Sequence, residues 1–265
     1  MEPETTIGAG LTIFALRDLI VKILGPTADY LGAEIKTWTE IAIKNVERIF
    51  QNAGKKLGDE IEKPGQVPPK ILRAILQEGQ FCDDELSAEY FGGVLASSRT
   101  SVSRDDRGVS FLSLIGRLST YQIRSHYIFY SILKRLYDGV DVEVGKALGR
   151  LSCFIPDGVY LEAMDFGNEE DDEILVPHIM NGLTRENLVR GWAAGGAAHI
   201  SQSLDKEVRD AGIMFRPSFL GMELFLWAHG LGNRSIAQFF AVGTIFEELS
   251  GITIPDGAEK GGYAP

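Results

Sequence analysis

The chain has 265 residues, of which 45% are hydrophobic and 24% charged, and 37 acidic against 26 basic residues give a formal net charge of −11. This length can bury a substantial core in one large or two small domains, and the composition is ordinary for a globular protein. The acidic balance disfavours non-specific binding to nucleic acid, which is a polyanion. Cys82 and Cys153 lie far apart with no CxxC pair, which argues against a disulfide scaffold or a zinc site and fits a reducing cytoplasm.

Residues 1–24 are predicted to contain an amphipathic helix. Its apolar side chains follow helical spacing at Ile13, Leu16, Ile20, Ile23 and Leu24. The uncharged stretch 5–16 is too short to span a bilayer. We expect this helix to dock on the protein core, and a peripheral membrane contact through residues 7–24 is the alternative.

Residues 25–150 are predicted to be a helical region, because apolar residues recur there at close to 3.6-residue spacing. One of its helices, capped by Asp83 or Asp84, contains the pair Gly92-Gly93. Each glycine costs about 1 kcal/mol relative to alanine inside a helix. We therefore expect a neighbouring helix to approach closely at this pair. Ser119 is expected to cap or interrupt the helix that continues to Tyr137.

Residues 151–256 are predicted to form a smaller α+β region, so the fold class is mostly α with a helical N-terminal half. Short strands are expected at 152–156 and 159–166, around a Pro156-Asp157-Gly158 turn. The acidic run 168–173 is expected to be a solvated loop.

The later part of this region contains a predicted helix, a predicted strand and a buried segment, Phe219 to His229, which periodicity allows to be either helix or strand. Thr184 resembles a helix N-cap, and the helix after it would present the small residues 193–198 to another helix. A strand is expected at 212–216, and residues 257–265 are expected to be a disordered tail.

Arginine, aspartate and histidine concentrate between residues 99 and 126. The candidate ligand-binding residues are Arg99, Arg104, Asp105, Asp106, Arg107, Arg117, Gln122, Arg124 and His126. If residues 116–137 form one helix, Arg117 and Arg124 share a face, with Gln122, His126 and Tyr130 in a neighbouring row. Guanidinium groups placed in this way would suit an anion. The competing interpretation is an ion-pair network, in which the two aspartates accept hydrogen bonds from Arg117 and Arg124.

No catalytic template fits these residues. The other histidines, His178, His199 and His229, lack the HExxH spacing, and neither a phosphate-binding GxxxxGK[ST] loop nor a GxSxG nucleophile motif occurs. We therefore predict no metal site and no cofactor, and whether the protein is an enzyme stays open.

Six segments between about residues 20 and 230 carry a family resemblance: LGPTADYLG at 24–32, VPP at 67–69, LQEG at 76–79, DDEL at 83–86, YFGGVLASS at 90–98 and FLGMELF at 219–225. They resemble the bacterial Abi-alpha (abortive infection alpha) family, as do RDDRG at 104–108 and YQIR at 121–124. The resemblance implies a link to phage defence and brings no established active site with it.

The leading hypothesis is a cytoplasmic phage-defence protein that acts as a sensor or growth-arresting effector through a protein partner or self-association. One alternative is a nucleotide or nucleic-acid hydrolase, or an anionic-ligand sensor, that uses the cluster at 99–126. Another is a membrane-perturbing effector that acts through the N-terminal helix.

Overall fold

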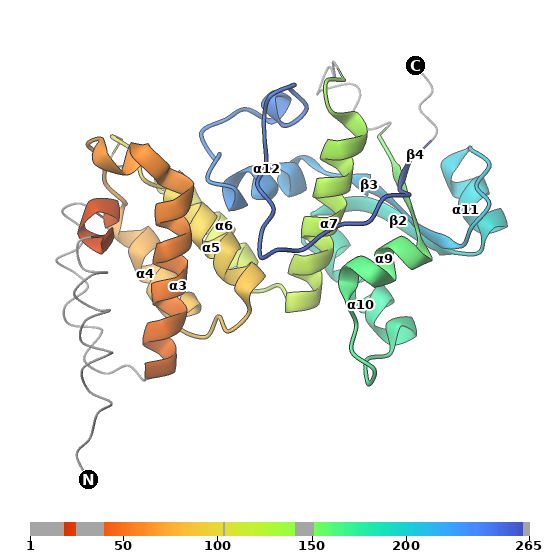
Figure 1. Cartoon of the computed structure of the whole chain (residues 1–265), viewed down its shortest axis with the longest axis horizontal. Coiled ribbons are helices and arrows are strands. Elements are labelled where there is room, and N and C mark those ends of the chain that lie inside the picture. The colour runs from red at the N-terminus through yellow and green to blue at the C-terminus, as the bar shows by residue number, and fades with distance from the viewer. Residues whose placement is uncertain (1–18, 25–39, 103, 141–150, 262–265) are drawn as a thin grey trace, which may run out of the picture. The chain divides into compact units, whose positions relative to one another are not determined.

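The computed structural model of the chain describes residues 19–24, 40–102, 104–140 and 151–261. It consists of two compact units (Figure 1). Unit 1 contains the chain up to Arg117 together with Trp227–Asn233, and unit 2 contains Leu118–Leu226 and the chain from Arg234 onward. The described residues are mostly α-helical, with a small antiparallel sheet in unit 2, so the predicted fold class is confirmed.

Unit 1 is built from helices. Residues 19–24 are helical. The elements that follow are α3 (Glu40–Leu57), the 3-10 helix η3 (Gly58–Glu62), α4 (Pro69–Gly79), α5 (Glu85–Ser97) and α6 (Gly108–Ile115). Helix α5 is buried along most of its length, and the carboxylate of Asp84 caps it by accepting a hydrogen bond from the Ser87 backbone amide at 2.7 Å.

The paired glycines of α5 lie where two other backbones approach. A Cβ atom on Gly92 would lie 2.7 Å from the Cβ of Asn52 in α3, and one on Gly93 would lie 1.9 Å from the carbonyl oxygen of Ala228. Only glycine fits at such distances, so the close helix contact predicted at this pair is confirmed, and the second neighbour is the backbone of the Trp227–Asn233 segment.

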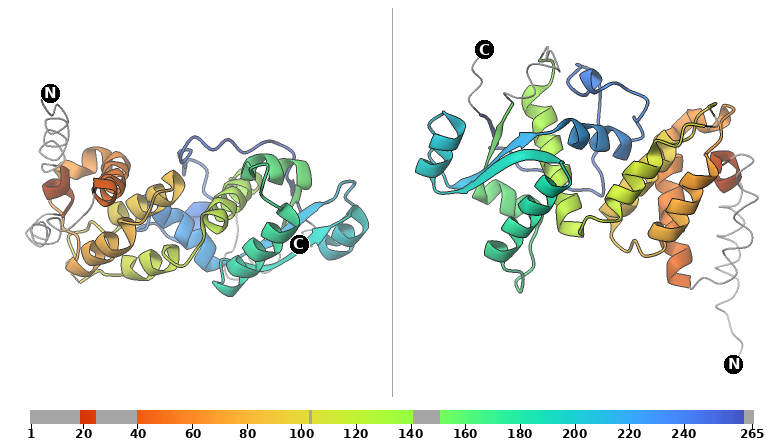
Figure 2. Two further views of the ribbon diagram at one scale, coloured as in Figure 1. Left: turned by 90° about the horizontal axis from the view of Figure 1, so that it is seen from below. Right: turned by 180° about the vertical axis from the view of Figure 1, so that it is seen from behind.

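Unit 2 combines helices with a four-stranded sheet. Its elements in chain order are α7 (Thr120–Tyr137), β1 (Cys153–Pro156), α9 (Asp157–Met164), α10 (Asp172–Arg185), β2 (Val189–Gly195), α11 (Ala197–Leu204), β3 (Gly212–Pro217), most of α12 (Phe219–Ala228), the 3-10 helix η5 (Ile236–Phe239) and β4 (Glu259–Lys260). The strand order is β2-β3-β1-β4, and each neighbouring pair is antiparallel. Figure 2 shows β2 and β3 side by side, with α11 in the connection between them.

Helix α7 packs on this sheet. The ring of Phe129 stacks on Phe215 of β3 with centroids 4.4 Å apart, and on Tyr160 of α9 at 5.9 Å. Both contacts lie within unit 2, which therefore begins at Leu118 and not after residue 150, where the sequence placed the end of the helical region. The boundary moves because the apolar face of α7 is buried against strands that follow it in the chain.

The strand predicted at 159–166 is wrong, because residues Asp157–Met164 form helix α9. The buried side chains of α9 are Tyr160, Ala163 and Met164, which have helical i, i+3, i+4 spacing. Pro156 stands at the N-cap and Asp157 in the first turn, where a carboxylate interacts favourably with the helix dipole. The Pro-Asp-Gly sequence thus begins a helix, although strand β1 is present as expected.

The helix predicted after Thr184 is also wrong. Thr184 lies in the last turn of α10, where its hydroxyl donates to the carbonyl oxygen of Met180 at 2.8 Å. The small residues 193–195 that follow belong to β2, and their register partners in β3 are Met214, Ile213 and Gly212. Pairing with β3 outweighs the local helix preference of alanine, because strand formation depends on a distant partner.

The chain beyond residue 256 is ordered where the structure describes it. Glu259–Lys260 form strand β4 against β1, and the amide of Gly261 donates to the carbonyl oxygen of Ser152 at 2.8 Å. The disordered tail predicted for 257–265 is therefore wrong at 259–261. The acidic run 168–173 is a loop only in part, since Asp171 caps α10 and the helix begins at Asp172. Residues 1–18 of the predicted N-terminal helix lie outside the described residues.

Candidate functional site

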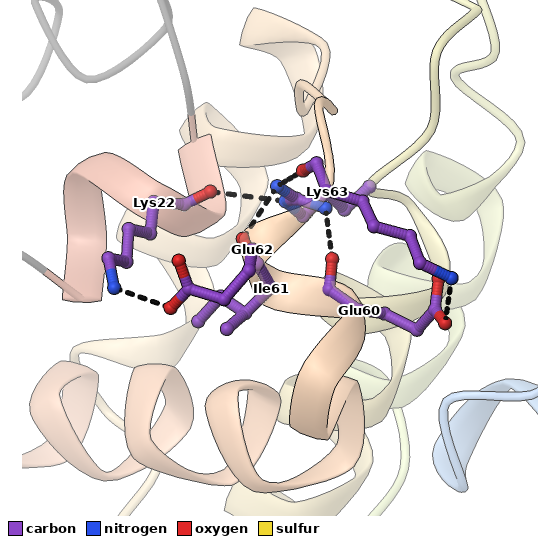
Figure 3. Close-up of polar contacts among 6 residues, drawn as sticks. Lys22, Glu60, Ile61, Glu62 and Lys63 are labelled. Atoms are coloured by element: carbon purple, nitrogen blue, oxygen red, sulfur yellow. Dashed lines mark hydrogen bonds and ion pairs between the residues drawn. The ribbon is translucent and has the colours of Figure 1, made fainter.

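Arg99 follows the end of α5 and binds backbone carbonyl groups. Its Nε donates to the carbonyl oxygen of Lys22 at 3.1 Å, and its Nη1 donates to that of Glu60 at 3.0 Å. Its Nη2 donates to the carbonyl oxygens of Ile61 at 3.1 Å and Lys63 at 2.5 Å. Figure 3 shows these four residues: Lys22 lies in the helical residues 19–24, Glu60 and Ile61 lie in η3, and Lys63 follows η3 directly. We call this arrangement the Arg99 clasp.

The Arg99 clasp leaves little room for a bound anion. A guanidinium group has five N–H donors, and four hydrogen bonds to carbonyl oxygens already engage its three nitrogens. The carbonyl groups at the end of a helix carry partial negative charge, which attracts the arginine and repels a phosphate or carboxylate. The Lys22–Glu62 ion pair at 2.6 Å strengthens the same junction. Arg99 therefore joins two segments of unit 1.

The 104–107 loop pairs its own charges. Arg107 donates two hydrogen bonds to Asp105, at 2.8 and 2.9 Å, and Lys70 of α4 donates to Asp106 at 2.8 Å. Hydrogen bonding from Arg107 lowers the pKa of Asp105, and hydrogen bonding from Lys70 lowers the pKa of Asp106. The guanidinium carbon of Arg107 also lies 5.5 Å from the ring centroid of Trp227. The ion-pair interpretation thus names the right aspartates, but Arg107 and Lys70 serve as their partners.

Residues 116–137 do not form one helix. Helix α6 ends at Ile115, and α7 begins at Thr120 with a capping box in which Ser119 and Gln122 exchange hydrogen bonds. The predicted cap at Ser119 is therefore confirmed. Arg117 lies in the connection, exposed, with its Nη1 donating to Ser113 at 3.0 Å. It does not share a helix face with Arg124, because the cap resets the helical phase.

The three cluster residues on α7 make hydrogen bonds to other segments of unit 2. His126 is fully buried, and its Nε2 lies 3.0 Å from the carbonyl oxygen of Gly221. A carbonyl oxygen can only accept, so Nε2 carries a proton and donates. Gln122 is buried beside His178, with 3.4 Å between the two Nε2 atoms. The half-buried Arg124 donates from Nε to the carbonyl oxygen of Ala163 at 2.9 Å, near the end of α9. As predicted, Gln122, His126 and Tyr130 share one face of α7, and that face is the core.

The two units divide the predicted cluster between them. Unit 1 holds the members up to Arg117, of which Arg104 has an exposed side chain, while Gln122, Arg124 and His126 belong to unit 2. Within the set, the structure brings Asp105 and Arg107 into direct contact. The arginines at 99, 107, 117 and 124 each bind protein groups that hold local structure.

Sequence reasoning missed the polar contacts that lock α7 to its neighbours. The hydroxyls of Ser125 and Tyr160 lie 2.6 Å apart, and Tyr130 donates to the carbonyl oxygen of Leu188 and accepts from the amide of Ser218. Burial raises the pKa of Tyr130 and of Tyr160. The hydroxyl of Tyr121 donates to the carboxylate of Glu170, which lowers the pKa of Glu170. Buried polar side chains at helical spacing on α7 were the sequence signal, but their partners come from residues 35 or more positions away.

Within the part of the chain that the structure describes, no group of three or more histidine, cysteine, aspartate and glutamate side chains could hold a metal ion. Both cysteines are buried free thiols, and burial raises the pKa of Cys82 to about 12. None of the helices described is both long and apolar enough to cross a bilayer.

No protein-family model, curated protein or solved structure matches the chain.

Proposed function

We propose that this chain is a bacterial phage-defence protein of the abortive-infection type, working in the cytoplasm as a sensor or growth-arresting effector through protein contacts. The observation that carries the proposal is that residues of the candidate cluster are already engaged within the protein. Arg99, Arg107 and His126 each bind a group of their own unit. A group that holds the fold in this way is poorly placed to attack a substrate or transfer a proton.

The resemblance to the Abi-alpha family supports the same proposal. Several of the similar segments are scaffold: Asp84 caps α5, and Gly92 and Gly93 admit neighbouring backbones. A likeness concentrated in capping and packing residues favours a shared fold whose surface supplies the function. Self-association or a separate protein partner would then transmit the signal.

One observation favours a second candidate, an anionic-ligand sensor in unit 2. Arg124 is half-buried, and its Nε is bonded to Ala163, while its terminal Nη groups bond no protein group within the described ranges. Such a guanidinium end can bind phosphate or carboxylate bidentately. The membrane-perturbing alternative gains no such support, because Ile23 and Leu24 are fully buried.

The first experiment measures phage plating efficiency on bacteria that express the wild-type chain, Arg124→Ala, or the matched control Arg73→Ala, whose exposed side chain lies on α4. Survival of infected cells is measured at high and low multiplicity. The proposal predicts protection with death of infected cells at high multiplicity, retained in both variants.

Loss of protection in a folded Arg124→Ala, with Arg73→Ala unaffected, would favour the ligand sensor instead. Unchanged plating by the wild type across a diverse phage panel would contradict both defence readings. Circular dichroism of the purified variants shows whether each one remains folded.

A further inference from the structure

Three large apolar side chains of unit 2 are exposed on two segments that touch. Val140, which follows α7, is 38% exposed, and the segment after η5 brings Val242 and Ile245, which are 79% and 81% exposed. The two parts lie side by side: the amide of Gly139 donates to the carbonyl oxygen of Phe240 at 2.8 Å, and a Cβ on Gly139 would lie 2.8 Å from Val242. We call Val140, Val242 and Ile245 the apolar patch.

Residues 244–247, which include Ile245 of this patch, show the side-chain alternation of a strand. Thr244 is buried and Phe246 packs against Phe225 at 5.0 Å, whereas Ile245 and Glu247 face solvent. Alternate burial with period two is typical of extended backbone. The segment nevertheless belongs to no strand of the described sheet.

The main chain of this segment also has free hydrogen-bonding capacity. Within the described ranges, the amide and carbonyl groups of Ile245, Glu247 and Glu248 bond no protein group. The segment is held in place at its two ends. Lys134 donates to the carbonyl oxygen of Ala241 at 3.0 Å, and the amide of Leu249 donates to the hydroxyl of Tyr127 at 3.0 Å. A segment that is anchored at both ends and has unbonded main-chain groups at Ile245 and Glu247 offers what strand addition requires of its host.

Charge indicates what can pair with this segment. Glu247 and Glu248 are exposed carboxylates beside the apolar patch, and the nearby Lys134 is mostly buried and already paired with Asp138. Another cation that contacts this segment, Arg234, donates to the hydroxyl of Thr244 at 3.5 Å. A second copy of the chain would bring the same two glutamates and the same net charge of −11 to the interface, which is unfavourable.

We propose that residues 242–248 bind an extended segment of a partner protein in which apolar residues alternate with lysine or arginine. The partner strand would pair with the free main-chain groups, place an apolar side chain on the apolar patch and set its basic groups against Glu247 and Glu248. This inference rests on the proposed function, because it assigns the protein contact to one surface.

The test uses the full-length protein and a fluorescein-labelled peptide of alternating isoleucine and lysine, followed by fluorescence anisotropy. We expect binding at least about tenfold tighter than that of the same peptide with glutamate in place of lysine. N-methylation of alternate peptide amides should abolish binding, because it removes main-chain donors. Ile245→Ser should weaken binding by about tenfold or more, the worth of one buried apolar side chain. The matched control Ile174→Ser, 68% exposed on α10, should leave binding unchanged.

A charge swap sharpens the test. Glu247→Lys with Glu248→Lys should reverse the preference, so that the glutamate peptide binds more tightly than the lysine peptide. Equal binding of the two peptides by the wild type, insensitivity to N-methylation, or equal loss in Ile174→Ser would overturn the proposal.

Two further results would assign the patch to another occupant and so reject the proposal. Light scattering that finds a dimer, dissociated by Ile245→Ser, would identify a second copy. Peptide binding that appears only after residues 141–150 are replaced by a glycine-serine linker would identify this chain's own segment. None of these measurements uses phage, so failure of the strand proposal and failure of the defence proposal remain distinguishable.

Discussion

The Arg99 clasp shows how one side chain can join segments that are distant in sequence. Its guanidinium reaches carbonyl oxygens of Lys22, Glu60, Ile61 and Lys63 at once, which a point charge cannot do. The sequence identified Arg99 as part of a charged cluster. Its partners are uncharged carbonyl groups, which every residue carries, so no residue pattern could reveal them.

We predict that Arg99→Lys loosens residues 19–24 without unfolding unit 1. A lysine ammonium cannot span both sets of carbonyl oxygens, and the loss should lower the free energy of unfolding by about 1–3 kcal/mol. Hydrogen exchange measured by mass spectrometry should show faster exchange at 19–24 and at Val67, whose amide faces the carbonyl oxygen of Leu24 at 3.5 Å. Arg73→Lys on α4 is the control, and equal exchange in both variants would contradict the clasp.

At the scale of elements, helix α5 is specified by what surrounds it. Its sequence contains two adjacent glycines, which weaken an isolated helix, yet it is among the most buried helices of unit 1. The glycines are tolerated because the backbones of α3 and of Ala228 occupy the space that two side chains would need.

We predict that Gly93→Ala destabilises the protein by about 3 kcal/mol or more, because the new Cβ would lie 1.9 Å from the Ala228 carbonyl oxygen and 2.2 Å from its carbonyl carbon. Backbone atoms cannot move aside as a flexible side chain can. Gly158→Ala in α9, where a Cβ has no neighbour within 4 Å, should change stability by no more than about 1 kcal/mol. Urea denaturation of both variants checks the difference, and similar midpoints would refute the close approach.

At the scale of the whole molecule, the two units share one chain that passes between them more than once. Unit 1 includes Trp227–Asn233, which follow most of unit 2 in the sequence. Trp227 is 1% exposed and stacks on Phe111 at 4.8 Å, and the amide of Gly232 donates to the hydroxyl of Ser97 at 3.0 Å. The N-terminal unit is therefore incomplete as a continuous fragment.

We predict that a fragment of residues 1–117 is less stable than the same fragment carrying residues 227–233 on a glycine-serine linker. Restoring a buried tryptophan is worth about 3–5 kcal/mol when its site is intact. The urea midpoint should rise on adding the segment, and adding a copy with Trp227 replaced by alanine should not raise it. Identical midpoints for all three fragments would show that unit 1 is complete without the segment.

The sequence by itself determined the features that depend on local physics. Helical spacing identified α4 to α7, and the glycine pair predicted a close contact. Residue type limited the caps to Asp83 or Asp84 and to a cap or interruption at Ser119, and the structure selects Asp84 and a cap at Ser119. The helical class and the small β-containing part follow from the same patterns.

Where local preference and distant pairing disagree, only the tertiary structure decided which secondary structure forms. Residues 193–195 became strand because β3 offers hydrogen bonds, and Asp157–Met164 became helix because Tyr160 and Met164 find a core beside α7. The candidate cluster divided for the same reason: the capping box before α7 separates Arg117 from Arg124, and each arginine takes partners from its own unit. Spacing along a chain fixes which residues share one helix face, whereas only the folded backbone decides which carbonyl or carboxylate lies opposite them.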